Sequence, residues 1–329
     1  MHTASRLLAA LAAAALLTAC GGDDADTADT AGGGDTASDY PSETITLLVP
    51  YAAGGPTDLT SRTVGNCLQE QLGQTVVVEN RPGGSGALAM QELIGAPPDG
   101  YTLSLVTAGT MVLTPLANDI DYAPEDITPI GVMAEVPSVL AVGEDSPYAD
   151  AEAFFAQAES EPGSITVGLP GASTPQGIEL QRLADEYDVQ VTAVPFDGNA
   201  EMTTALLGGN VDAVLINASK DVVENIDAGS FTPIAASSEE RLSWLPDTPT
   251  LAESGFPELT LSGSTFGLAG PAGLPEDVTE TLESGLEDCM AEPEVQKGIG
   301  EQYVPEPFVG ADGLAEVLSE TQEVYEPIL

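Results

Sequence analysis

From residue 43 onward the chain alternates apolar strands, glycine-containing turns and amphipathic helices, and this alternation limits the folds open to it. In the first instance, residues 44–50 form a nearly continuous apolar run, Gly54 and Gly55 form a turn, and residues 58–72 have helical periodicity. Continuous apolar strands that alternate with helices are typical of parallel sheets covered on both faces. The sequence therefore predicts an α/β fold.

The alternation occurs in two units of similar rhythm. The first is expected to contain strands at 44–50, 76–79 and 101–106 and helices at 58–72 and 87–94. The second is expected to contain strands at 165–168, 191–194 and 213–216 and helices at 175–187 and 200–207. Two such βαβαβ units imply two lobes.

Two apolar extended stretches, residues 138–142 and 264–268, flank the second unit. If both cross between the lobes, the helices expected at 278–290 and 314–325 complete the first lobe. Periodicity alone equally allows two sequential domains, so the topology stays open at this point.

The charge of the chain excludes several kinds of partner and of chemistry. The 53 Asp and Glu residues against 7 Lys and Arg give a net charge of −46, which repels nucleic acid phosphates. The only histidine is His2. If residues 1–20 are a cleaved leader, the mature chain has no imidazole for Ser-His-Asp or Cys-His catalysis or for most zinc sites. We expect no metal and no cofactor.

The N-terminus has the pattern of a bacterial lipoprotein signal, with Arg6, eleven apolar residues over 7–17 and then Leu-Thr-Ala-Cys ending at Cys20. Eleven apolar residues are too few to span a bilayer but suit a signal peptide. The resemblance to a lipobox implies that Cys20 is lipid-modified; the alternative is ordinary secretory cleavage with an incidental cysteine. Residues 21–40 are acidic, lack large aliphatic side chains and are expected to form a disordered linker.

Two further cysteines, Cys67 and Cys289, both fall in helical patterns. An extracytoplasmic location permits a disulfide between them. The alternative is two separately buried thiols. A disulfide would tie the first helix of the fold to a late one and would require the chain to return to where it began.

Four turns are candidates for a ligand site, because ligands of open α/β sheets bind beyond the carboxyl ends of the strands. They occupy residues 50–58, 107–110, 170–175 and 195–198. Each turn alone is more often a structural helix cap, but four turns at equivalent positions suggest a shared cleft. Free N–H groups at helix starts can hold a carboxylate without a charged side chain.

These turns belong to a wider set of sequence blocks that resembles the substrate-binding receptors of tripartite tricarboxylate transporters over roughly residues 44–329. The blocks are 50–58 (PYAAGGPTD), 79–84 (ENRPGG), 98–103 (PDGYTL), 195–198 (PFDG), 206–212 (LLGGNVD), 246–250 (PDTPT) and 267–273 (GLAGPAG). The resemblance implies a two-lobed periplasmic-binding-protein-like fold, in which each lobe is a mixed sheet flanked by helices and two strands cross between the lobes. The implied domains are a first lobe from 41–139 and 263–329 and a second lobe from 140–262.

The resemblance also implies ligand-binding residues in the four loops. They are Tyr51, Ala53, Gly54, Gly55, Thr57 and Asp58 in the first, Thr107, Ala108 and Thr110 in the second, Gly171, Ser173 and Thr174 in the third, and Phe196 and Gly198 in the fourth.

The chain departs from the family pattern in two of these loops. In the third loop, Pro175 stands near the position where the family has a histidine. In the fourth, Phe196-Asp197-Gly198 replaces a Tyr-Lys-Gly-like triplet. An Asp197 that faced the cleft would repel a second carboxylate, whereas on the outer face it would only add surface charge.

Three other side chains could contact an anion or a ring, but structural roles are favoured for them. Arg81 is expected to hold its loop, Arg62 to pair on the surface or between helices, and Trp244 to pack rather than to stack on a ligand.

The sequence thus predicts a monomeric, lipid-anchored extracytoplasmic receptor that captures a small carboxylate and delivers it to a membrane transporter of the tripartite tricarboxylate type, without covalent chemistry. One alternative is the same module presenting its ligand to a sensor kinase. Another is an extracytoplasmic enzyme with an Asp/Glu pair, such as a glycosidase. The enzyme is disfavoured because aromatic residues are only 5% of the chain and no carboxylate pair stands out at a strand end.

Overall fold

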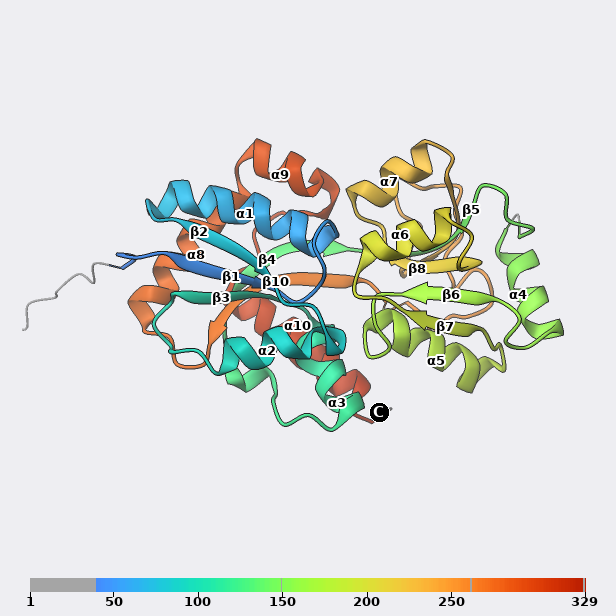
Figure 1. Cartoon of the computed structure of the whole chain (residues 1–329), viewed down its shortest axis with the longest axis horizontal. Coiled ribbons are helices and arrows are strands. Elements are labelled where there is room, and N and C mark those ends of the chain that lie inside the picture. The colour runs from blue at the N-terminus through green and yellow to red at the C-terminus, as the bar shows by residue number, and fades with distance from the viewer. Residues whose placement is uncertain (1–39, 149, 261, 328) are drawn as a thin grey trace, which may run out of the picture. The chain divides into compact units, whose positions relative to one another are not determined.

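The computed structural model describes residues 40–148, 150–260, 262–327 and 329. The predicted leader, the lipidation at Cys20 and the linker up to residue 39 therefore lie outside the described residues. Within the described residues, the chain forms two five-stranded mixed sheets, each flanked by helices (Figure 1). The predicted fold class, α/β with two mixed sheets flanked by helices, is confirmed.

The first sheet has the strand order β2-β1-β3-β10-β4. Its strands are β1 (Ile45–Val49), β2 (Val76–Asn80), β3 (Thr102–Val106), β4 (Ile127–Val136) and β10 (Ser264–Pro271). β1 pairs in parallel with β2 and β3, while β10 lies antiparallel between β3 and β4. We call this sheet and the helices packed on it the first lobe.

Two layers of helices cover the first sheet. Apolar side chains of α1 (Pro56–Leu72), α8 (Glu276–Met290) and α9 (Pro293–Ile299) fill the core on one face. Those of α2 (Ala87–Ile94) and α10 (Ala311–Tyr325) fill the core on the other, together with the π-helix at Gly109–Leu113, which leads into α3 (Thr114–Asn118). The C-terminal helices thus belong to the lobe in which the described chain begins.

The second sheet has the strand order β7-β6-β8-β5-β9, and with its helices it forms the second lobe. Its strands are β5 (Ser138–Gly143), β6 (Thr166–Leu169), β7 (Thr192–Pro195), β8 (Ala213–Asn217) and β9 (Phe231–Ser237). α4 (Ala151–Ser160) and α5 (Pro175–Tyr187) pack on one face, and α6 (Asn199–Leu207) and α7 (Lys220–Asp227) pack on the other. Only β5 runs antiparallel to its neighbours β8 and β9, as β10 does in the first sheet.

The chain crosses between the two sheets twice, at points slightly different from those expected. Residues 138–142 belong wholly to the second sheet, so the first crossing lies at Pro137, between the end of β4 and the start of β5. Residues 264–268 belong wholly to the first sheet, which places the second crossing just before Ser264. Each stretch is fixed to one sheet because antiparallel ladders on both sides take up its backbone hydrogen bonds.

Several element boundaries differ from the predicted ones. α1 begins at Pro56 rather than at residue 58, because proline suits the first position of a helix. α8 and α10 also begin two or three residues earlier than expected. Tyr40, predicted to end the linker, donates a hydrogen bond from its hydroxyl to the Gly100 carbonyl and packs on Tyr101.

A disulfide joins Cys67 of α1 to Cys289 of α8, with their Cα atoms 5.8 Å apart. Both residues lie in the same apolar core on one face of the first sheet. The bond joins residues 222 positions apart and so connects the two parts of the chain that build the first lobe.

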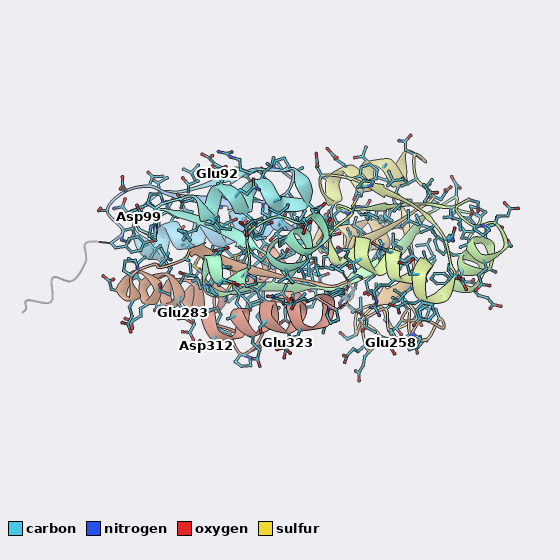
Figure 2. All side chains as sticks on the ribbon, turned by 90° about the horizontal axis from the view of Figure 1, so that it is seen from below. Glu92, Asp99, Glu258, Glu283, Asp312 and Glu323 are labelled. Carbon is cyan, nitrogen blue, oxygen red and sulfur yellow. A yellow bond between two sulfur atoms is a disulfide. The ribbon has the colours of Figure 1, made fainter. Side chains whose placement is uncertain are left out.

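The outside of the protein is strongly acidic. Figure 2 shows acidic side chains such as Asp99, Glu258 and Glu323 projecting from the ribbon, and all three residues are exposed. Among the described residues, no helix combines the length and the apolar character needed to cross a membrane.

We predict that replacing both cysteines (Cys67→Ser with Cys289→Ser) lowers the free energy of unfolding by about 2–5 kcal/mol, because the unfolded chain regains the freedom that the cross-link removes. Urea unfolding of the double variant and the wild type measures this difference. As an independent check, a digest of the unreduced protein should contain one peptide pair joined through these cysteines. Finding both thiols free would contradict the prediction.

Candidate functional site

A small cavity of about 20 Å³ lies where loops of both lobes meet. Its lining contains no charged side chain. The lining residues are Tyr51, Ala52, Gly55, Pro56, Thr57, Thr107, Pro170, Thr174, Pro175, Gln176, Gly198, Asn199, Asn217, Ser264 and Phe266. A volume of this size has room for about one water molecule, so a larger guest requires the lobes to move apart.

Three helices begin at this cavity. α1 of the first lobe and α5 and α6 of the second contribute residues of their first turns to the lining. The first N–H groups of a helix have no partner within the helix, and its N-terminus carries a partial positive charge. Proline at the first position of α1 and α5 removes one such group without loss. The arrangement favours an anion.

Hydrogen bonds join loops of the two lobes near the cavity. The Ala52 N–H of the first lobe donates to the Asp197 carbonyl of the second at 3.0 Å. Asn118 Nδ2, at the end of α3, donates to Ser173 Oγ at 2.7 Å. The described structure is therefore a closed form of the cleft.

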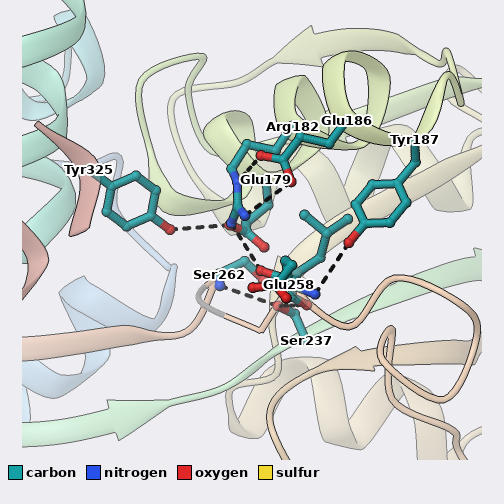
Figure 3. A network of polar contacts seen from close by, with 9 residues as sticks. Glu179, Arg182, Glu186, Tyr187, Ser237, Glu258, Ser262 and Tyr325 are labelled. Atoms are coloured by element: carbon teal, nitrogen blue, oxygen red, sulfur yellow. Dashed lines mark hydrogen bonds and ion pairs between the residues drawn. The ribbon is translucent and has the colours of Figure 1, made fainter. Parts of the chain in front are cut away.

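A buried ionic cluster adds a further contact between the lobes (Figure 3). The Tyr325 hydroxyl of α10 donates to Glu179 Oε1 of α5 at 3.2 Å, and Arg182 pairs with Glu179 at 2.9 Å and with Glu186 at 2.8 Å. Burial, followed by the charge of Glu179, raises the pKa of the Tyr325 phenol well above its usual range. The phenol therefore remains a donor to the carboxylate.

Tyr303, which follows α9 in the first lobe, makes another contact with the second lobe. It donates a hydrogen bond from its hydroxyl to the Ala218 carbonyl of the second lobe. The Trp244 ring packs edge-on against the Tyr303 ring, with centroids 6.2 Å apart. Trp244 also touches the apolar cores of both lobes and does not line the cavity, so it packs as predicted rather than stacking on a ligand.

Six of the predicted ligand-binding residues line the cavity, with at least one from each predicted loop. They are Tyr51, Gly55, Thr57, Thr107, Thr174 and Gly198. Burial raises the pKa of the Tyr51 phenol to about 12, although a hydrogen bond with Thr107 acts in the opposite direction. Tyr51 is thus a neutral hydrogen-bonding group at physiological pH.

The other predicted residues of the first two loops lie away from the lining and shape the loops. Gly54 has a φ of +87°, which favours glycine, and its N–H donates to Asp58 Oδ2 at 2.9 Å. Thr110 Oγ1 accepts a hydrogen bond from the Thr107 N–H at 3.0 Å. Ala53 is exposed and Ala108 is half-buried beside them.

The third and fourth loops also combine residues that line the cavity with residues that lie away from it. Gly171, with a φ of +131°, leaves no room for a side chain beside Ser85 of the facing lobe. Ser173 forms the contact with Asn118 described above. The Phe196 ring packs over Gly168, and Asp197 is exposed and does not line the cavity.

The sequence analysis missed four polar lining residues, namely Gln176, Asn199, Asn217 and Ser264. Gln176 and Asn199 stand in the first turns of their helices, directly after predicted loop residues, and this position was a usable signal. Asn217 and Ser264 come from a strand end and a strand start that only the tertiary fold brings together.

The arginines nearest to the first loop are already paired with carboxylates. Arg62 lies 2.8 Å from Asp58, and Arg81 pairs with Glu79 and with Glu92. Burial pushes the pKa of the Asp58 carboxyl upward, but hydrogen bonds from Arg62, the Gly54 N–H and Asn80 outweigh it and lower the pKa below its usual value. No group of metal-ligating side chains occurs among the described residues.

Comparisons with known proteins agree with this geometry. A sequence model described as "Tripartite tricarboxylate transporter family receptor" matches residues 37–327. The "UPF0065 protein in gbd 5'region" of Cupriavidus necator is 30% identical over 294 residues, 89% of this chain and 88% of its own length.

Two solved structures are similar over most of their length. MatC from Rhodopseudomonas palustris, solved with bound malate, has a TM-score of 0.80 at 29% identity, covering 88% of this chain and 99% of that one. An R. palustris protein solved with adipate has a TM-score of 0.77 at 27% identity, covering 88% and 97%.

We predict that Asp58→Asn lowers the free energy of unfolding by about 2 kcal/mol at pH 7, because the ion pair with Arg62 is lost and the hydrogen bond from the Gly54 N–H no longer ends on a charged oxygen. The folded-state pKa of Asp58 is depressed, so its contribution is present above the unfolded-state pKa and disappears as pH falls through the folded-state value. The difference between the wild type and Asp58→Asn in urea unfolding should therefore shrink as the pH falls below the unfolded-state pKa and disappear below the folded-state pKa.

The matched control is Asp197→Asn, which removes an exposed carboxylate and should change stability by less than about 0.5 kcal/mol. An Asp58→Asn effect that stayed constant from pH 7 to pH 3 would show that the carboxylate charge is not the cause.

Proposed function

Because the chain belongs to the tripartite tricarboxylate transporter receptor family, we propose that it captures a small carboxylate between its two lobes and delivers it to a membrane transporter of that type. Members of this family are periplasmic solute-binding receptors and not enzymes. The identity of the carboxylate and the delivery step are the parts that we infer.

The observation that carries the proposal is a cavity reached by three helix N-termini and lined by no charged side chain. Backbone N–H groups at helix starts bind carboxylates well, since they combine hydrogen bonding with the helix dipole. The helix dipoles act within about one turn of the helix end. Repulsion of the ligand by the distant surface carboxylates is screened at physiological salt, so these carboxylates oppose binding only weakly. MatC was solved with malate and the other R. palustris protein with adipate, and both ligands support the proposal that this chain binds a small organic acid.

We propose that the predicted loop residues divide into two roles. Those in the lining contact the ligand, while Asp58, Thr110, Gly171, Ser173 and their neighbours hold the loops in shape. Ala53, Gly54, Ala108 and Phe196 belong to the second group.

Closure around the ligand would use the two crossings as a hinge. The contacts from Ala52, Asn118, Tyr303 and Tyr325 to the second lobe form only when the lobes meet. A ligand that bridges α1 and α5 would add its own contacts to this set and shift the population toward the closed form. The transporter would then distinguish the loaded receptor from the empty one.

We further propose that the receptor is a monomer anchored to the outer face of the cell membrane through Cys20. The prediction that follows is that Cys20→Ser moves the protein from the membrane fraction to the soluble fraction, because a lipid chain on this residue supplies the attachment. Immunoblots of fractionated cells measure the distribution. A wild-type control treated with detergent should also become soluble, and retention of Cys20→Ser in the membrane fraction would contradict the anchor.

We predict that at least one small carboxylate raises the melting temperature of the purified protein, since a ligand at 100 times its Kd adds about 2.7 kcal/mol to the free energy of unfolding. A thermal-shift screen over di- and tricarboxylates, aromatic acids and amino acids tests this, followed by calorimetry on the hits. If no acid binds, the proposed function fails.

A matched pair of variants then tests the cavity itself. A Cβ at Gly55 would lie 3.6 Å from the Asn199 nitrogen of the facing lobe, an ordinary contact, so Gly55→Ala should bind almost as the wild type does. Gly55→Val adds two methyl groups against Asn199 and should weaken binding about tenfold or more, because overpacking costs about 1–3 kcal/mol. Arg81→Ala should have a small effect. Loss of binding in Arg81→Ala with normal binding in Gly55→Val would favour an arginine clamp instead.

A further inference from the structure

Gln176 is a deeply buried polar side chain at the cavity, with 1% of its surface exposed. It lies in the first turn of α5. Its Nε2 donates to Ser138 Oγ at 2.9 Å and to Asn217 Oδ1 at 2.7 Å. Its Oε1 is buried and has no hydrogen-bond partner in the protein.

The orientation of the Gln176 amide follows from its neighbours. Besides Gln176, Ser138 Oγ contacts the Ser262 carbonyl at 2.7 Å and Asn217 Oδ1 at 3.1 Å, both of which can only accept. The single Ser138 proton must go to one of them, so Ser138 can only accept from Gln176. Asn217 Oδ1 also accepts from Ser264 Oγ at 3.1 Å. The Gln176 nitrogen therefore faces this cluster, and its oxygen is left without a partner in the protein.

A second buried polar atom without a partner faces the cavity from the other lobe. Thr57 Oγ1 lies in the first turn of α1, and only 4% of the residue is exposed. A threonine hydroxyl can donate to a carboxylate, as can the N–H groups beside it at the helix start. Gln176 Oε1 can only accept, so a carboxylate oxygen placed against it would be repelled.

We propose that Gln176 Oε1 makes the receptor selective for carboxylates that also carry a hydrogen-bond donor, a hydroxyl or an ammonium group, over the same carbon skeleton without it. This inference rests on the proposed function and names the substrate class. The carboxylate binds at the start of α1 near Thr57, and the donor of the ligand binds Gln176. A site with a buried acceptor rejects an analogue that leaves this acceptor unpaired.

The test compares matched pairs of acids by calorimetry on the wild-type protein: malate with succinate, 2-hydroxyglutarate with glutarate, citrate with tricarballylate, and aspartate with succinate. In each pair that binds, the member with the hydroxyl or ammonium group should bind at least about tenfold more tightly. Equal or tighter binding of the member that lacks the donor would overturn the inference while leaving the proposed function intact.

Gln176→Met gives the matched variant, since it keeps the length of the side chain and removes the acceptor. The ratio of affinities within a pair should fall toward one, even if both affinities drop because the bonds to Ser138 and Asn217 are lost. An unchanged ratio in a folded Gln176→Met protein would overturn the inference. If the variant does not fold, the wild-type ratios decide alone. If no acid in these pairs or in the wider screen binds, the proposed function itself fails.

Discussion

The near absence of free positive charge is the constraint on which the proposed anion site depends. The chain has 7 basic residues against 53 acidic ones. Among the described residues, all four arginines, Arg62, Arg81, Arg182 and Arg241, pair with carboxylates. Positive potential at the cavity therefore comes from backbone dipoles, which need helices that start at one point. The two mixed sheets provide that point, because parallel strands deliver successive helices to the same edge.

The sequence predicted local elements well where one element follows another along the chain. The pattern over 87–94 and over 175–187 coincides with α2 and α5. The crossings could not be derived from periodicity, since β10 pairs with β3 and β4 from more than 120 residues earlier, and only tertiary packing selects such partners. The same reason explains why only some of the cavity residues were predicted. Glycine turns could be seen in the sequence, whereas Asn217 and Ser264 reach the cavity from strands whose neighbours the sequence does not reveal.

The polar cluster around Gln176 also joins the cavity to the hinge. Ser138 is the first residue after the first crossing and Ser264 is the first residue of β10 after the second. Both contact Asn217, and Ser138 also contacts Gln176. The residues that line the cavity and those at which the chain changes sheets are thus one hydrogen-bonded unit. A substitution in this polar cluster is expected to alter the closure of the lobes as well as the contacts to the proposed ligand.

Trp244 gives the protein an internal optical probe. It is the single tryptophan of the chain, and it packs against Tyr303 and against apolar side chains of both lobes. Separation of the lobes would change the polarity around the indole and its distance from the Tyr303 ring. When the indole is excited at wavelengths that tyrosine does not absorb, the emission comes from this one residue, and a change in its wavelength or intensity would report the proposed opening of the cleft. Stopped-flow fluorescence of the unlabelled protein can therefore resolve the rate of closure from the rate of ligand encounter.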